Sequence, residues 1–247
     1  MIATNAVPKP VTLLLEFDGA LYAGDLPIQA FARRLAESLP DEAGVGLVAG
    51  MRRFLESRDV PGDPGTDLSS AQDGRQAVEV LAAAGGLDAA GIEAAYRQSR
   101  HDVARTAFAI EPPAGLVEFL TGLPATTRVA VVSAADDTGV VEVLEAGELT
   151  ASVDEIVCGT YGPGRRQAIV AAAVARSGSP ERVIGVDSRW SGLLADVAAA
   201  GGWTALVDRF GVAERCGGTP DAVGPDVTSL LPVLQTHIAR LTDPEIS

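Results

Sequence analysis

Five short, uninterrupted apolar runs constrain the fold of this chain more than any other feature. They cover residues 11–15, 129–132, 156–157, 183–186 and 205–207. Strands of a parallel sheet are buried on both faces, so they read as continuous apolar runs rather than as alternating ones. Helical patterns at residues 138–146, 166–176 and 193–200 separate the last four runs. The alternation predicts an α/β fold with a doubly wound, Rossmann-like parallel sheet.

The chain between the first two runs has a different pattern. Residues 26–39, 45–57, 75–84 and 89–109 read as helices, and none of this stretch resembles a strand. Pro112, Pro113 and Gly115 then mark the return to the sheet. We therefore predict a core domain of residues 1–22 and 112–247, with an inserted all-helical cap domain of residues 23–111. A last amphipathic segment, residues 227–241, is expected to pack on the core as a closing helix.

Composition narrows the classes of partner. The formal net charge of −14 disfavours binding to nucleic acid or to an anionic membrane surface, because both require basic patches. A small ligand is the expected partner. The two cysteines, Cys158 and Cys216, could form only one disulfide and have no zinc-type spacing. Residues 1–10 lack the pattern of a signal peptide. These features together predict a cytoplasmic protein.

Polar side chains follow four of the predicted strands. In a parallel sheet the carboxyl ends of the strands meet at one edge, where ligands bind near the point of strand-order reversal. Phosphoryl transfer requires carboxylates that hold a metal ion. It also requires a hydroxyl and a guanidinium group that bind the phosphate. The residues that supply them here, in chain order, are Glu16, Asp18, Ser133, Arg165, Arg166 and Asp187.

With these motifs in this order, the chain resembles the haloacid dehalogenase superfamily over residues 11–241. The resemblance is to the branch with a helical cap, which includes phosphoglycolate phosphatases and β-phosphoglucomutases. Residues 15–21, LEFDGAL, are similar to the family's first motif, Asp-x-Asp-Gly-(Thr/Val)-Leu. Ser133 matches the second motif, and residues 183–188, VIGVDS, match the fourth. Ser191 stands where many members carry a further acidic residue.

The resemblance implies a role for each matched residue. Glu16 stands at the position of the attacking carboxylate, Asp18 at that of the general acid/base, and Ser133 at that of the phosphoryl-binding hydroxyl. Mg²⁺ is the implied cofactor, with Glu16, Asp18 and Asp187 as its ligands. The third motif is a lysine in the family, and Lys9 is the only lysine here. Arg165, at the start of a predicted helix, is the candidate for that charge, with Arg166 nearly as good.

Glutamate at the nucleophile position keeps the charge but moves the carboxylate by about one carbon–carbon bond, and a misplacement of about 1 Å costs roughly a hundredfold in rate. Three hypotheses follow. The chain is a magnesium-dependent phosphohydrolase of a small phosphorylated or otherwise anionic metabolite, weakened by Glu16. Alternatively, it is a non-hydrolytic protein that binds a ligand in the same cleft, or an enzyme in which Asp18 performs other acid/base chemistry.

A row of cationic side chains lies in the predicted cap. Arg97, His101 and Arg105 are spaced by four residues and therefore share one face of a helix. If that face is turned toward the core, these residues bind an anionic substrate. A solvent-exposed charged face is the alternative interpretation.

Overall fold

The computed structural model describes residues 9–56, 66–160 and 163–242, and it contains one parallel sheet of six strands. Their order, β3-β2-β1-β4-β5-β6, is that of a doubly wound sheet, with the reversal between β1 and β4. The predicted fold class is therefore confirmed. The strands are β1 (Val11–Glu16), β2 (Thr127–Val132), β3 (Glu155–Val157), β4 (Val183–Asp187), β5 (Trp203–Val207) and β6 (Ala222–Gly224).

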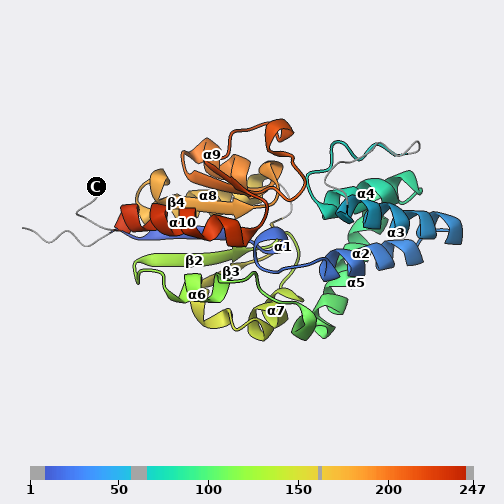
Figure 1. Ribbon diagram of the computed structural model, residues 1–247, viewed down its shortest axis with the longest axis horizontal. Coiled ribbons are helices and arrows are strands. Elements are labelled where there is room, and N and C mark those ends of the chain that lie inside the picture. Colours follow the sequence, from blue (N-terminus) through green and yellow to red (C-terminus); the bar gives the residue numbers. More distant parts are fainter. Residues whose placement is uncertain (1–8, 57–65, 161–162, 243–247) are drawn as a thin grey trace, which may run out of the picture.

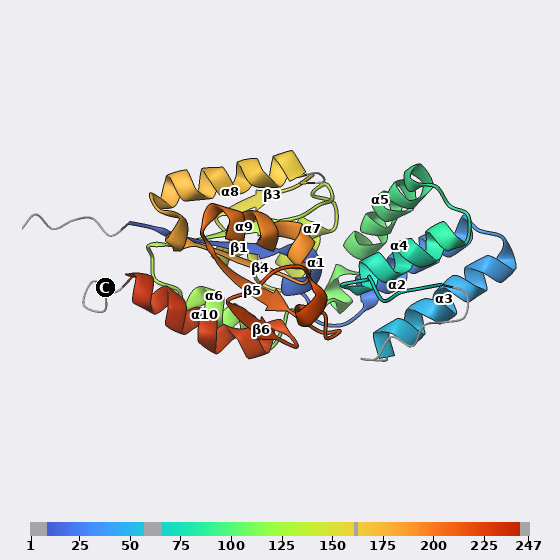
Figure 2. The ribbon, with the colours of Figure 1, turned by 90° about the horizontal axis from the view of Figure 1, so that it is seen from above.

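Helices cover both faces of the sheet (Figure 2). Leu13 and Leu15 of β1 belong to a core cluster with residues of α6, α7 and α10, whereas Leu14 packs with residues of α8 and α9 on the opposite face. This is why the strand reads as an uninterrupted apolar run. The core helices are α1 (Phe17–Ala20), α6 (Leu116–Thr121), α7 (Val140–Ala146), α8 (Pro163–Ser177), α9 (Ala195–Ala200) and α10 (Val227–Thr242).

The cap lies beyond the carboxyl ends of the strands, to the right in Figure 1. In the described part of the cap the helices are α2 (Leu26–Glu37), α3 (Asp41–Glu56), α4 (Gly74–Ala84) and α5 (Ala89–Arg105). Their inward faces form an apolar cluster of their own, which includes Phe31, Met51 and Tyr96. The chain segments that leave and re-enter the core are joined by a hydrogen bond of 2.7 Å from Ala23 N to Glu111 O. This contact lies where the sequence predicts the domain boundaries.

Several element bounds differ from the sequence-based ones. Helix α3 begins at Asp41 rather than at residue 45, and α5 ends at Arg105, before a short 3₁₀ turn at Ala107–Ala109. The short edge strand β6 was not predicted, because an exposed valine between two small residues carries no strand signal. Within the described residues, no helix is long and apolar enough to cross a membrane.

The two-sided burial of β1 predicts the cost of a cavity there. Leu14 is 1% exposed, and Leu14→Ala is expected to lower the free energy of unfolding by about 2–5 kcal/mol. Val233 on α10 is 40% exposed, so Val233→Ala is the control and should change it by less than about 0.5 kcal/mol. Urea unfolding measures both. Equal effects of the two substitutions would contradict the packing described above.

Candidate functional site

Two carboxyl groups lie where the sheet reverses its strand order. Glu16 ends β1 and Asp187 ends β4, and these strands are neighbours with Leu15 opposite Val186. Ser133 follows β2, the neighbour of β1 on its other side. The topology thus brings three of the candidate residues to the same sheet edge. This edge faces the cap (Figure 1).

Glu16 is buried, at 5% exposure, and neither of its carboxyl oxygens has a hydrogen-bond partner among the described residues. Burial, followed by the negative charges of Asp187 and Asp18, raises its pKa well above the usual range. The guanidinium group of Arg189 acts in the opposite direction. In this closed arrangement the Glu16 side chain is therefore held toward its neutral, protonated form.

Asp18 has the opposite environment, because the cap surrounds it with donors. Tyr96 donates its hydroxyl to Oδ2 at 2.6 Å, and Arg100 donates Nη1 to Oδ1 at 3.2 Å. The Tyr22 hydroxyl also lies 3.2 Å from Oδ1, and Arg75 Nη1 lies 3.9 Å from Oδ2. Burial favours the neutral carboxyl, yet Arg100, Arg75 and Tyr96 hold the pKa of Asp18 below its ordinary value. The carboxylate is thus ionised and bound to the cap.

Asp187 is held by the backbone that follows it. Its Oδ1 accepts a hydrogen bond from Arg189 N at 2.9 Å, and its Oδ2 accepts one from Leu193 N at 2.8 Å. Burial raises the pKa of Asp187, against the lowering effect of Arg189. The Arg189 side chain turns to the cap, where its Nε lies 3.1 Å from Oδ2 of Asp73. Ser188 Oγ lies 3.3 Å from the same oxygen.

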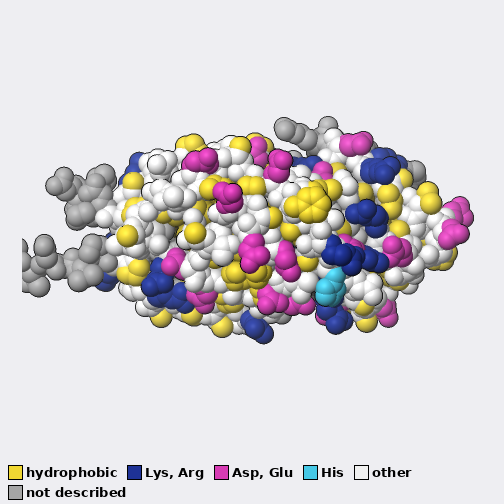
Figure 3. Space-filling view, turned by 90° about the horizontal axis from the view of Figure 1, so that it is seen from below, with side chains coloured by type: hydrophobic (Ala, Val, Ile, Leu, Met, Phe, Trp, Pro, Cys, Tyr) yellow, Lys and Arg dark blue, Asp and Glu magenta, His cyan; other side chains and the backbone are white. Residues whose placement is uncertain are grey.

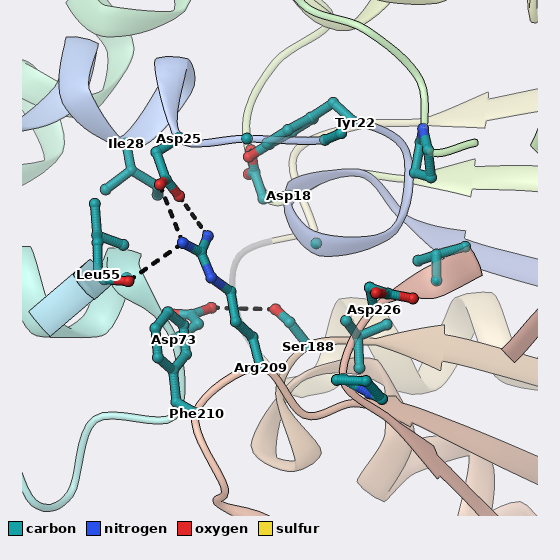
Figure 4. Close-up of a pocket in the computed structure, with 18 of the residues that line it drawn as sticks. Asp18, Tyr22, Asp25, Ile28, Leu55, Asp73, Ser188, Arg209, Phe210 and Asp226 are labelled. Carbon is teal, nitrogen blue, oxygen red and sulfur yellow. Dashed lines mark hydrogen bonds and ion pairs between the residues drawn. The ribbon is translucent and has the colours of Figure 1, made fainter. Parts of the chain in front are cut away.

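A cavity of about 610 Å³ lies between core and cap beside this cluster. Asp18, Tyr22 and Ser188 line its inner side, and Arg75 belongs to its lining as well. At its rim the guanidinium group of Arg209 points toward the Asp25 carboxylate and the Leu55 carbonyl (Figure 4). Its size suits a small metabolite, and the rim pair joins core to cap.

Glu16 and Asp187 lie behind the lining of this cavity rather than in it, and the candidates from the second and third motifs do not line it either. The Ser133 side chain is fully buried and accepts a hydrogen bond from Ala135 N at 3.2 Å. Arg165 is exposed on α8 and borders a separate cavity of about 250 Å³. Arg166 pairs with Asp196 at 3.3 Å. Lys9 precedes β1, at the opposite end of that strand from Glu16.

The row on α5 points outward. Arg97 and Arg105 are 62% and 68% exposed and pair with Glu93 and Asp102 of the same helix, and His101 is also exposed. Figure 3 shows several basic side chains, in dark blue, on the surface of the cap. These three residues lie outside the lining of the core–cap cavity, as members of a solvated face. It is Arg100, on the same helix, that reaches Asp18.

Five residues at the site were not singled out from the sequence: Asp73, Arg75, Tyr96, Arg100 and Arg189. A signal existed for one of them, since Arg189 follows the fourth motif directly. Arg75 and Arg100 are almost fully buried, but their spacing does not distinguish them from exposed arginines of the same helices. Their role depends on how the cap docks.

The oxygens at this edge do not fit Mg²⁺, the cofactor that the resemblance implies. Both oxygens of Asp18 and both of Asp187 already accept hydrogen bonds, so among the three implied ligands in the described residues only Glu16 has oxygens without a hydrogen-bond partner. Mg²⁺ needs several oxygens in near-octahedral geometry, including waters. Guanidinium groups approach these carboxylates instead, and no cluster of three or more His, Cys, Asp or Glu side chains suited to a metal is found in the described part of the chain.

Solved structures share this arrangement of core and cap. A haloacid dehalogenase-like hydrolase from Streptococcus pneumoniae aligns with a TM-score of 0.60 at 14% identity, over 92% of this chain and 100% of that one. CbbY from Rhodobacter sphaeroides, in complex with phosphate, aligns with a TM-score of 0.55 at 19% identity, over 90% of this chain and 96% of that one. An L-2-haloacid dehalogenase aligns with a TM-score of 0.54 at 16% identity, over 93% of this chain and 100% of that one. The chain has the haloacid dehalogenase fold.

Sequence comparisons add nothing to this likeness, since no protein-family model matches the chain and no curated protein matches it. The haloacid dehalogenase fold accounts for the placement of Glu16 and Asp187 at one edge beneath a helical cap. At these identities it does not carry an activity with it.

The raised pKa of Glu16 predicts a pH-dependent effect of Glu16→Gln. The folded chain binds this proton more tightly than the unfolded chain, so the contribution of Glu16 to the free energy of unfolding falls as the pH rises above 4.5. Glutamine does not titrate. The variant should therefore gain stability relative to wild type between about pH 5 and pH 8, by up to about 1.4 kcal/mol per pH unit until the folded pKa is reached. Urea unfolding at both pH values tests this, and a constant difference would contradict it.

The ion pairs of Asp18 predict that Asp18→Asn strongly destabilises the chain. The substitution leaves the buried guanidinium group of Arg100 without its charge partner, at a cost of about 3–5 kcal/mol near neutral pH, whereas Arg75 keeps its ion pair with Glu79 at 2.9 Å. Because the folded pKa is lowered, the stabilisation by Asp18 exists above the unfolded pKa and is lost as the pH falls, so the difference from wild type should shrink toward pH 3 or so. Asp102→Asn, which breaks the more exposed pair with Arg34, is the control and should cost about 1 kcal/mol or less.

Proposed function

We propose that this chain is a hydrolase of the haloacid dehalogenase type, acting on a small phosphorylated or otherwise anionic metabolite. The observation that carries the proposal is the position of Glu16 and Asp187 at adjacent strand ends, under a cap that leaves a cavity of about 610 Å³. The phosphate bound to CbbY supports an anionic substrate. The cytoplasmic location predicted from the sequence belongs to the same proposal.

In this proposal the Glu16 carboxylate attacks the phosphorus of a phosphate ester, and the ester oxygen leaves as an alcohol with a proton from Asp18. Asp18 takes a proton back from the water that then hydrolyses the acyl phosphate to phosphate and free Glu16, and the cap controls how far Glu16 is ionised. Attack requires an ionised carboxylate, whereas burial and neighbouring carboxylates keep Glu16 toward its neutral form when the cap is closed. Separation of cap from core admits water and removes part of the desolvation that raises this pKa. It also releases Asp18 from Arg100 and Arg75 to act as acid/base.

Arg75 has a second part in the proposed cycle. It lines the cavity from the cap side and carries a buried positive charge. An anionic substrate offers this guanidinium group the same kind of bidentate partner as a carboxylate does. Substrate binding therefore competes with Asp18 for the arginine. Because the oxygens at the site do not fit Mg²⁺, no step of this proposal uses a metal.

A second candidate function is ligand binding without turnover. It is favoured by the commitment of both Asp18 oxygens to Tyr96, Arg100 and Tyr22, which leaves no free acid/base in the closed form. In that case wild type binds an anionic metabolite at the cavity and returns it unchanged. Repurposed acid/base chemistry predicts instead a conversion of the ligand that is lost in Asp18→Asn.

Shortening the side chain at position 16 tests the hydrolase proposal. Glu16→Asp should raise hydrolysis of phosphate esters, by up to roughly the hundredfold that an error of about 1 Å costs, whereas Glu16→Gln should abolish it. A panel of phosphorylated metabolites, assayed with and without Mg²⁺, gives the measurement. Arg128→Ala, at an exposed pair with Asp154, is the control and should leave the rate unchanged.

The arginine at the third-motif position needs its own variant. Arg165 has a larger and planar head group than lysine, so the double change Glu16→Asp with Arg165→Lys is assayed beside the single one. No hydrolysis by the folded double variant, whether Mg²⁺ is present or absent, would overturn the hydrolase proposal. Binding of a panel member by wild type without its conversion would then support the second candidate.

A further inference from the structure

The cation beside the carboxyl groups of β1 and β4 belongs to the chain itself. Arg189 lies two residues after Asp187, and its backbone N donates to Asp187 Oδ1 at 2.9 Å. This bond places the start of the Arg189 side chain at the strand end. The side chain is 16% exposed and reaches Asp73 of the cap, with Nε 3.1 Å from Oδ2. A single arginine thus stands between a core carboxylate and a cap carboxylate.

Glu16 also lies within the electrostatic reach of Arg189. The positive charge of this arginine lowers the pKa of Glu16, against the raising effects of burial, Asp187 and Asp18. Asp73 and Asp187, in turn, hold the pKa of Arg189 above its usual range although burial opposes its charge. The guanidinium group is therefore paired with Asp73 of the cap, and it lies in the loop directly after Asp187, whose carboxylate its backbone N contacts.

The last carboxylate of the cluster has its own guanidinium partners. Asp18 pairs with Arg100 at 3.2 Å and lies 3.9 Å from Arg75, and both arginines come from the cap. A divalent cation entering this edge would meet the positive charge of Arg189, in surroundings of low polarity where like charges repel strongly. It would also have to displace backbone donors from Asp187.

We propose that Arg189 supplies, within the chain, the positive charge that a divalent cation would otherwise bring to Glu16 and Asp187. The cleft then keeps its closed, charge-compensated form without a divalent cation. Removal of this one guanidinium group converts the strand ends into a site that takes such a cation. The inference does not depend on hydrolysis, because it concerns which cation the carboxyl groups accept.

Direct binding of Mn²⁺ tests the inference without an activity assay. Wild type, Arg189→Ser and Arg176→Ser are titrated with MnCl₂, and free Mn²⁺ is followed by electron paramagnetic resonance. Arg176→Ser breaks an arginine–carboxylate pair with Glu155 that is remote from the cleft, so it is the matched control. Wild type and the control should bind no Mn²⁺ stoichiometrically, whereas Arg189→Ser should bind one equivalent, and the added change Asp187→Asn should remove it.

Thermal unfolding gives a second readout. At about a hundred times its dissociation constant, Mn²⁺ should raise the melting temperature of Arg189→Ser by roughly 5–10 °C and leave that of wild type unchanged. If Arg189→Ser is unfolded without metal, Mg²⁺ or Mn²⁺ should restore a cooperative transition. Saturable binding of one Mn²⁺ by wild type would overturn the proposal. So would a folded Arg189→Ser that binds none, or an unfolded one that the cations do not rescue.

Discussion

Carboxyl groups cannot be buried together at a sheet edge unless positive charge accompanies them. Several kilocalories per mole are needed to remove each ion from water, and like charges at close range add to that cost. In this protein the compensation comes from guanidinium groups of the cap and of the loop after β4, while one carboxyl group is kept toward its neutral form. The carboxyl groups are those of Glu16, Asp18, Asp73 and Asp187, and the guanidinium groups are those of Arg75, Arg100 and Arg189.

This compensation couples the cap to the core. Asp18 of the core is paired with cap arginines, and Asp73 of the cap is paired with Arg189 of the core. At the rim, Arg209 of the core pairs with Asp25, and the ring of Phe210 packs against that of Phe54 at a tilt of 39°, with the ring centroids 4.6 Å apart. Opening the cap separates each of these pairs. The docking of the cap on the core therefore depends on these charges.

The sequence allowed prediction of the sheet and of the residues at its carboxyl edge. Apolar runs buried on both faces and helical periodicity are local signals, and they identified five of the strands, the cap helices and the carboxyl groups Glu16 and Asp187. The same reasoning could not separate Arg97, His101 and Arg105 from Arg100. All four lie on α5, and only the docking of that helix decides which side meets the core. Arg165 matched a motif spacing, yet its side chain lies on the exposed surface of α8.

The amino-acid sequence by itself determined the parallel α/β sheet and the inserted helical cap. It also determined that one carboxyl group would stand at the end of β1 and another at the end of β4. These properties depend on the hydrophobic pattern and on the order of the motifs. Both are signals carried by residues that are close together in the sequence. Tertiary structure alone decided the protonation of Glu16, the partners of Asp18 and the cation beside Asp187. Those depend on burial and on distances between charges from segments far apart in sequence, such as Asp18 with Arg100 and Asp73 with Arg189, and electrostatic energies change steeply with both.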